Sequence, residues 1–95
     1  MSFVVFLRPV REEMPLGPTE EEARIVGEHL AYLQKLCDEG KVVVAGPSVV
    51  PGDTIGITIM DVEDEAEART LMNDDPAIVN GIMTGELRPL RIAVR

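Results

Sequence analysis

His29 is the only histidine in the chain, and an imidazole can act as a general base near neutral pH. It lies within the apolar arc of an expected helix, between the directions of Leu33 and Leu36. One interpretation is a catalytic base whose basicity is set by burial and a nearby carboxylate. The other is a histidine of the core or of a dimer interface that is satisfied by a backbone carbonyl. The residue types alone leave both interpretations open.

Other candidates for a site follow on the same stretch. Gly46, Pro47 and Ser48 come at the end of an expected strand, where a glycine lets a ligand approach the backbone and a serine supplies a hydroxyl. The alternative for these three is a simple turn. Cys37 is expected to point into the apolar helix face as a small hydrophobic residue. Tyr32, the only tyrosine, is expected at an interface or at the rim of a pocket.

Several classes of function are disfavoured by what the sequence contains. One His and one Cys without ligand spacing predict no metal site, and neither a phosphate loop nor a nucleophile elbow is present. We therefore expect no cofactor. The net charge of −8 argues against nucleic acid and against anionic membrane surfaces as partners.

Length and composition predict one small domain over residues 1–95. With 45% hydrophobic but only 3% aromatic residues, its core must be aliphatic. A single cysteine fits a reducing, cytoplasmic setting. The apolar run Phe3 to Leu7 is too short for a signal peptide, and no segment is long enough to span a bilayer.

The first half of the chain must position His29. The continuous apolar run Phe3 to Leu7 predicts a strand buried on both faces, and Val10 to Pro18 a loop. Thr19-x-x-Glu22 matches a capping box, so a helix is expected from Thr19 until Gly40 closes it. Its apolar face is expected to contain Ala23, Val26, Leu30, Leu33, Leu36 and Cys37.

The second half predicts two more strands, a helix and a final strand. Val42 to Ala45 is a β-branched strand that Gly46-Pro47 ends. The alternation of Ile55, Ile57 and Ile59 with other residues predicts a further strand with one face on a core. These two strands are expected to pair as a hairpin. A second helix is expected over Val62 to Asn73, with Val62, Ala66, Leu71 and Met72 buried. A short turn over Ala77 to Asn80 and a strand over Glu86 to Arg95 follow.

This order is β-α-β-β-α-β, which predicts a ferredoxin-like α+β fold: a four-stranded antiparallel sheet with two helices on one face. The other sheet face would then expose apolar residues, because the strands are apolar on both sides. A homodimer formed through that sheet face would cover them.

The chain resembles the YCII-related (YciI-like) family of the dimeric α+β barrel superfamily. The matching pieces are FVVFLRP, EHLAYLQKLCDEGKVVVAGP, DDPAIVNGI and ELRPLRIAV, in this order and over nearly the whole chain. The resemblance implies a ferredoxin-like protomer that dimerises through its sheet, with a pocket between helices and sheet. Most members have no assigned reaction, and a few have been linked to lyase-type chemistry, such as elimination on a small ring substrate.

The resemblance also implies an acid–base dyad, which falls on His29 and Asp75. The Asp would orient the imidazole and stabilise its protonated form. Asp before Pro is also a common turn or cap residue, and Asp74 is the adjacent alternative partner. Many members have an aromatic residue after the Asp-Pro pair, whereas this chain has Ala77. The expectation is proton transfer on a small organic molecule; the alternative is a non-catalytic ligand-binding or assembly module with a structural histidine.

Overall fold

The computed structural model describes residues 1–95 and has the expected alternation of strands and helices. A four-stranded sheet is accompanied by two helices and a third, single-turn helix. The elements are β1 (Ser2–Pro9), α1 (Glu20–Asp38), β2 (Val42–Ser48), β3 (Ile55–Asp61), α2 (Glu65–Asn73), α3 (Pro76–Val79) and β4 (Met83–Pro89).

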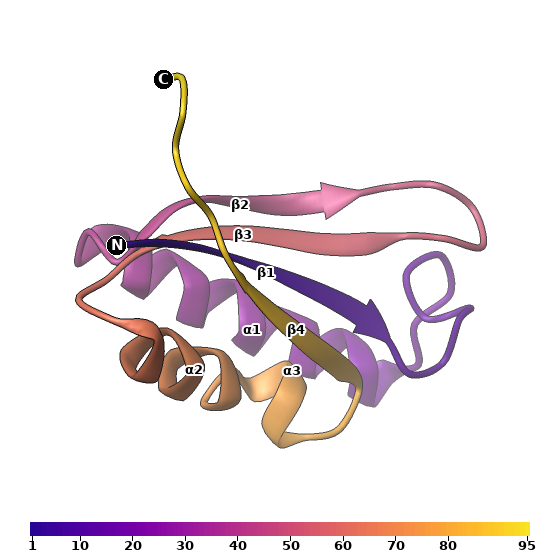
Figure 1. Cartoon of the computed structure of the whole chain (residues 1–95). Coiled ribbons are helices and arrows are strands. Elements are labelled where there is room, and N and C mark those ends of the chain that lie inside the picture. The colour runs from indigo at the N-terminus through magenta and orange to yellow at the C-terminus, as the bar shows by residue number, and fades with distance from the viewer.

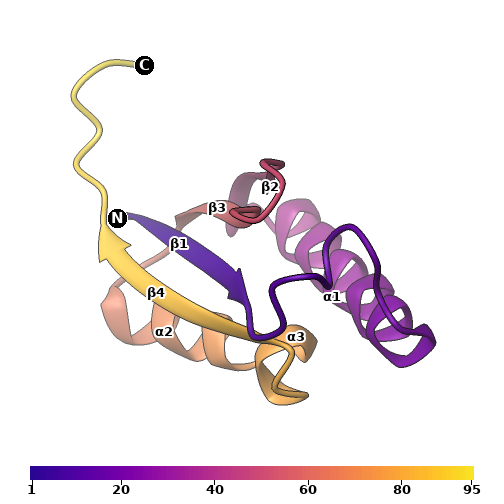
Figure 2. The ribbon, with the colours of Figure 1, turned by 90° about the vertical axis from the view of Figure 1, so that its right-hand side faces the viewer.

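The sheet is antiparallel throughout, with strand order β2-β3-β1-β4. All three helices lie on one side of it, and the chain after β4 extends away on the other side (Figures 1 and 2). This is the ferredoxin-like α+β arrangement that the order of elements predicted. The edge strands are β2 and β4, so Pro89 lies at an edge, where its missing N–H costs no ladder bond within this sheet.

The start of α1 is fixed by the expected capping box. The Thr19 hydroxyl accepts a hydrogen bond from the Glu22 N–H at 3.1 Å, and the Glu22 carboxylate accepts one from the Thr19 N–H at 2.8 Å. At the other end Gly40 has φ 77°, the left-handed conformation that a glycine adopts without steric cost. These two signals place α1, and therefore His29, in a defined position along the chain.

The core lies between the sheet and the helices. β1 contributes Phe3, Val5 and Leu7, each no more than 2% exposed. Because Val5 pairs with Thr58 and Phe3 with Met60, these β3 residues point to the same helix-facing side. The isoleucines of β3 therefore point to the opposite face of the sheet. The apolar run of β1 was predicted to be buried on both faces, but only the helix-facing side is buried, and Val4 and Phe6 on the other side are half-buried.

Three boundaries and one buried face in β2, α2 and β4 differ from the sequence-based expectations. β2 continues through Gly46-Pro47 to Ser48, because an edge strand tolerates a proline. α2 begins only at Glu65, where Asp64 caps it, and it buries Ala68 and Met72 rather than Ala66. The last strand runs over Met83–Pro89, and in residues 90–95 only the Leu90 N–H makes a backbone hydrogen bond to the sheet.

None of the helices combines the length and apolarity that crossing a membrane requires.

Candidate functional site

His29 lies at the centre of the buried face of α1. The buried residues of this helix are Ile25, His29, Leu33 and Leu36. The expected face was therefore displaced: Ala23, Leu30 and Cys37 are exposed, and Cys37 is not packed inside the core as predicted. Ala23, Val26, Leu30 and Cys37 form a second apolar stripe beside the buried one, and this stripe lines a cavity. His29 lies where the two stripes meet.

The carboxylate of Asp75 lies against the His29 ring. Both of its oxygens, Oδ1 and Oδ2, are 2.8 Å from His29 Nδ1. The two residues are 6% and 3% exposed, so water does not separate or screen them. Asp74, the adjacent alternative, is exposed and ends α2.

Local structure explains why Asp75 is in that position. It is the N-cap of α3, and its Oδ1 accepts a hydrogen bond from the Ala77 N–H at 2.9 Å. Pro76 occupies the first helical turn, where its missing N–H is not needed. The cap and the imidazole contact use the same carboxylate, so the turn after α2 holds the charge against the ring. The two interpretations of Asp75, cap and histidine partner, are thus compatible.

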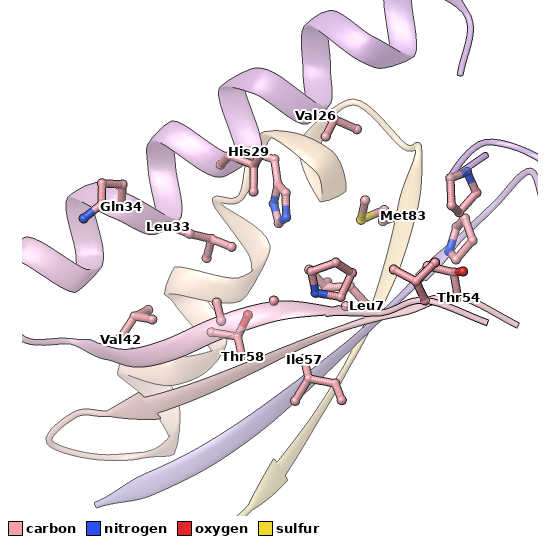
Figure 3. Close-up of a pocket in the computed structure, with 18 of the residues that line it drawn as sticks. Leu7, Val26, His29, Leu33, Gln34, Val42, Thr54, Ile57, Thr58 and Met83 are labelled. Carbon is pink, nitrogen blue, oxygen red and sulfur yellow. The ribbon is translucent and has the colours of Figure 1, made fainter. Parts of the chain in front are cut away.

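A cavity of about 750 Å³ opens on the other side of the His29 ring, between α1 and the β2 and β3 side of the sheet. Figure 3 shows the ring pointing from α1 toward the sheet. The volume is in the range of small-molecule sites. Most of the side chains around it are aliphatic, and they include Leu7, Val26, Leu30, Leu33, Val42, Val43, Val49 and Met83, with the prolines of the β1–α1 loop.

The cavity contains no formal charge apart from what His29 can carry. None of its 24 lining residues is Lys, Arg, Asp or Glu. Asp75 is not among them either, so the carboxylate lies behind the ring and the ring separates it from the cavity. Nδ1 is occupied by Asp75, which leaves Nε2 as the nitrogen available to a bound molecule. No cluster of three or more His, Cys, Asp or Glu side chains is placed to hold a metal ion.

Only two of the three strand-end candidates line the cavity. Gly46 and Pro47 line the cavity. Ser48 pairs with Ile55 on the sheet face turned away from the helices and is not part of the lining, so the structure does not bring it to His29. The sequence reasoning missed Thr58, which lines the cavity and is buried; its alternation with the isoleucines of β3 was the available signal.

Tyr32 fastens α1 to the end of α2. Its hydroxyl donates a hydrogen bond to the Leu71 carbonyl at 2.8 Å. Burial, together with the negative charges of Asp74, Asp75 and Glu39, raises the pKa of Tyr32 to about 12, so the hydroxyl remains a donor at ordinary pH. It contributes by positioning the segment that leads to Asp75 and does not line the cavity.

The loop that forms one wall of the cavity is held by an ion pair. Arg11 donates to the Glu22 carboxylate at 3.1 Å (Nε) and 2.5 Å (Nη2), and to the Gly17 carbonyl at 2.8 Å. Met14 and Pro15, between these anchors, line the cavity. The Arg11 hydrogen bond, followed by that of the Thr19 N–H, lowers the pKa of Glu22 from 4.5 to about 2.

Acid should therefore weaken this anchor. Because the folded-state pKa of Glu22 is lowered, its stabilisation is present above pH 4.5 and is lost as the pH falls toward about 2. We expect the wild-type protein to melt at a higher temperature than Glu22→Gln at neutral pH, with the difference closing over that interval. Thermal melts of both proteins from pH 7 to pH 2 measure this. A difference that stays constant with pH would show that the carboxylate charge contributes nothing.

Comparison with known proteins finds a matching family model and similar solved structures. The YCII-related domain family model matches residues 1–90. The fold is similar to that of 5-chloro-2-hydroxyhydroquinone dehydrochlorinase from Burkholderia phenoliruptrix, solved in complex with 2,5-dihydroxybenzoquinone. That match has a TM-score of 0.74 and 21% sequence identity over 96% of this chain and 94% of the other. A search of curated proteins found no match. By the family match, the chain belongs to the YCII-related domain family.

Proposed function

We propose that the protein is an enzyme of the lyase type, in which His29 and Asp75 transfer a proton during an elimination on a small organic molecule. The observation that supports this most is the buried contact of 2.8 Å between His29 Nδ1 and the Asp75 carboxylate, beside a cavity. A structural histidine could be satisfied by a backbone carbonyl. A buried ionisable pair at the wall of a pocket is instead typical of acid–base sites.

In the proposed reaction each residue has one role. Asp75 accepts the Nδ1–H of His29, which fixes the ring orientation and leaves a lone pair on Nε2 toward the cavity. Nε2 takes a proton from the substrate while the leaving group departs with its bonding electrons, so a double bond forms. The buried carboxylate stabilises the imidazolium that results. The proton then returns to the leaving group or to solvent through the mouth of the cavity.

The structural neighbour suggests where to begin a test. It is a dehydrochlorinase, an enzyme that removes hydrogen and chlorine from its substrate. We expect the present protein to release chloride from 5-chloro-2-hydroxyhydroquinone or from another halogenated ring in a small panel. Chloride is measured over time at several enzyme concentrations, with oxygen excluded because hydroquinones oxidise.

His29→Gln is the decisive variant, since glutamine retains much of the size but cannot take up a proton. The rate is expected to fall by about 10²–10⁴-fold. Chloride release that His29→Gln leaves unchanged would contradict the proposed role of His29. A protein that binds members of the panel without converting any would favour the ligand-binding alternative.

We also propose a homodimer formed through the sheet face that the helices leave uncovered. Val4 pairs with Ile59, and Ile59 pairs with Val44, so three aliphatic side chains adjoin on that face. Val44 is 59% exposed in the single chain. A second copy that packs the same face against it would bury this surface symmetrically.

A reducing compartment such as the cytoplasm remains the setting that we propose for the protein, because it has a single cysteine, Cys37.

Placing a charge on this face should separate the two copies. Ile59→Lys is expected to elute as a monomer at micromolar concentration, whereas the wild type elutes as a dimer, because a buried lysine without a partner is costly. Ala31→Lys, on the exposed side of α1, is the control and should leave the dimer intact. A monomeric wild type in size-exclusion chromatography with light scattering would refute the dimer.

A further inference from the structure

Thr58 is a buried polar residue in a largely aliphatic wall. It lies on β3 and is 2% exposed, and its pairing with Val5 and Ala45 places it on the side of the sheet that faces the helices. Its neighbours along the strand on that side are Gly56 and the buried Met60. A valine would fill such a position without any polar atom. The hydroxyl is therefore not required by the sheet.

The Thr58 hydroxyl has no hydrogen-bond partner within the protein. Every side-chain polar atom that is fully sealed from solvent does have a partner. Its oxygen must therefore retain access to open space, and the cavity is the space that Thr58 lines. A buried polar group without a partner costs free energy unless water or a ligand satisfies it. This is the same situation as that of His29 Nε2.

The two unpartnered groups come from opposite walls. Figure 3 shows His29 pointing from α1 toward the sheet, and Thr58 rising from the sheet toward the helix. Two other lining residues are polar but already have partners within the protein: the Gln34 amide donates to Asp38, and the Thr54 hydroxyl bonds with the Val50 backbone. Most of the remaining wall is aliphatic, and no lysine or arginine lines the cavity. A molecule in this space meets a nitrogen on one side and a hydroxyl on the other, with apolar contacts around it. Apart from His29 itself, whose charge is already paired with Asp75, a carboxylate or phosphate would find no cation to compensate its desolvation.

We propose that Thr58 is a specificity-determining residue whose Oγ1 hydrogen-bonds an oxygen of the substrate, and that the substrate is uncharged and largely apolar with a hydroxyl or carbonyl group. This inference rests on the proposed function, because it takes the cavity beside His29 as the substrate site. It goes further by naming a second polar contact and by excluding anions.

A pair of probes that differ by one oxygen isolates the contribution of Thr58. Binding of 2-naphthol and of naphthalene is measured by fluorescence with the full-length protein and with Thr58→Val, which retains the shape and removes the hydroxyl. The wild type is expected to prefer 2-naphthol, and Thr58→Val should lose about three- to tenfold of that preference while its affinity for naphthalene is unchanged. Thr58→Ser, which keeps a hydroxyl, should retain the preference.

Three results would overturn the inference. They are a preference that Thr58→Val leaves unchanged, no binding of either probe by the wild type, and binding of 2-naphthoate as tight as that of 2-naphthol. These measurements involve no proton transfer. If no chloride is released while Thr58→Val loses the preference for 2-naphthol, the proposed reaction is wrong and the role of Thr58 is right. If chloride is released while Thr58→Val keeps the preference, the role of Thr58 is wrong and the proposed reaction is right.

Discussion

Replacement of Asp75 by asparagine is expected to slow the elimination by about 10²–10⁴-fold. Asparagine has nearly the same shape, but it carries no charge to stabilise an imidazolium. Its NH₂ group can donate to Nδ1, in which case the ring proton moves to Nε2 and the cavity meets a donor where the reaction needs an acceptor. The initial rate of chloride release, measured at saturating substrate, reports this loss directly.

Asp74→Asn is the matched control for that variant. Asp74 is the preceding residue and is exposed, so the same chemical change there should leave the rate within about twofold of wild type, because exposed charges are strongly screened. Equal losses of rate in the two variants would mean that the negative charge of this region, and not the contact of Asp75 with His29, supports the reaction.

His29→Ala is expected to have the largest effect on stability, about 3–5 kcal/mol, because it leaves the Asp75 carboxylate buried with only the Ala77 N–H as a partner. That is a large part of the 5–15 kcal/mol by which a small domain is typically stable. Urea unfolding measures the loss of stability. All variants are compared at one protein concentration, because the apparent stability of a dimer depends on its concentration.

The double variant His29→Ala/Asp75→Ala separates the buried charge from the lost packing. Removing the carboxylate as well should recover part of the stability, so that the double variant is more stable than the sum of the two single losses predicts. Strict additivity would show that the two residues do not interact in the folded protein.

The sequence predicted the order of elements because the strongest signals are local. The capping box at Thr19 and the left-handed Gly40 require only neighbouring residues, and the structure confirms both. The faces of the elements were harder to predict. The apolar residues of α1 extend over two stripes, and only packing against the sheet decides that Ile25 is buried and Leu30 is exposed.

The same limit explains the errors in the strands. Isoleucine at alternate positions of β3 predicts one buried face, but the helices pack on the face with Thr58 and Met60. Both faces of this sheet are apolar, so hydrophobicity could not distinguish them. Residues 90–95 alternate like a strand, yet a strand needs a neighbour to pair with, and none is present within one chain.

The candidate site depended on contacts that are remote in sequence. No pattern of spacing joins His29 to Asp75, since their approach is determined by how α1 packs beside α3; the pair could be suggested only through the resemblance to a family. Ser48 does not line the cavity, because one residue along a strand reverses the side to which a side chain points. Thr58 was overlooked because it lies between Ile57 and Ile59 in a strand that was interpreted by its isoleucines alone.

The most direct test of the account is the protonation pattern of the single imidazole, observed by ¹⁵N NMR at alkaline pH with the ring neutral. Only one histidine contributes, so the signals need no assignment by mutation. We predict a proton on Nδ1, where Asp75 accepts it, and an unprotonated Nε2 that is perturbed when a ligand enters the cavity. A proton on Nε2 in the wild-type protein, with no response to Asp75→Asn, would contradict the proposed dyad.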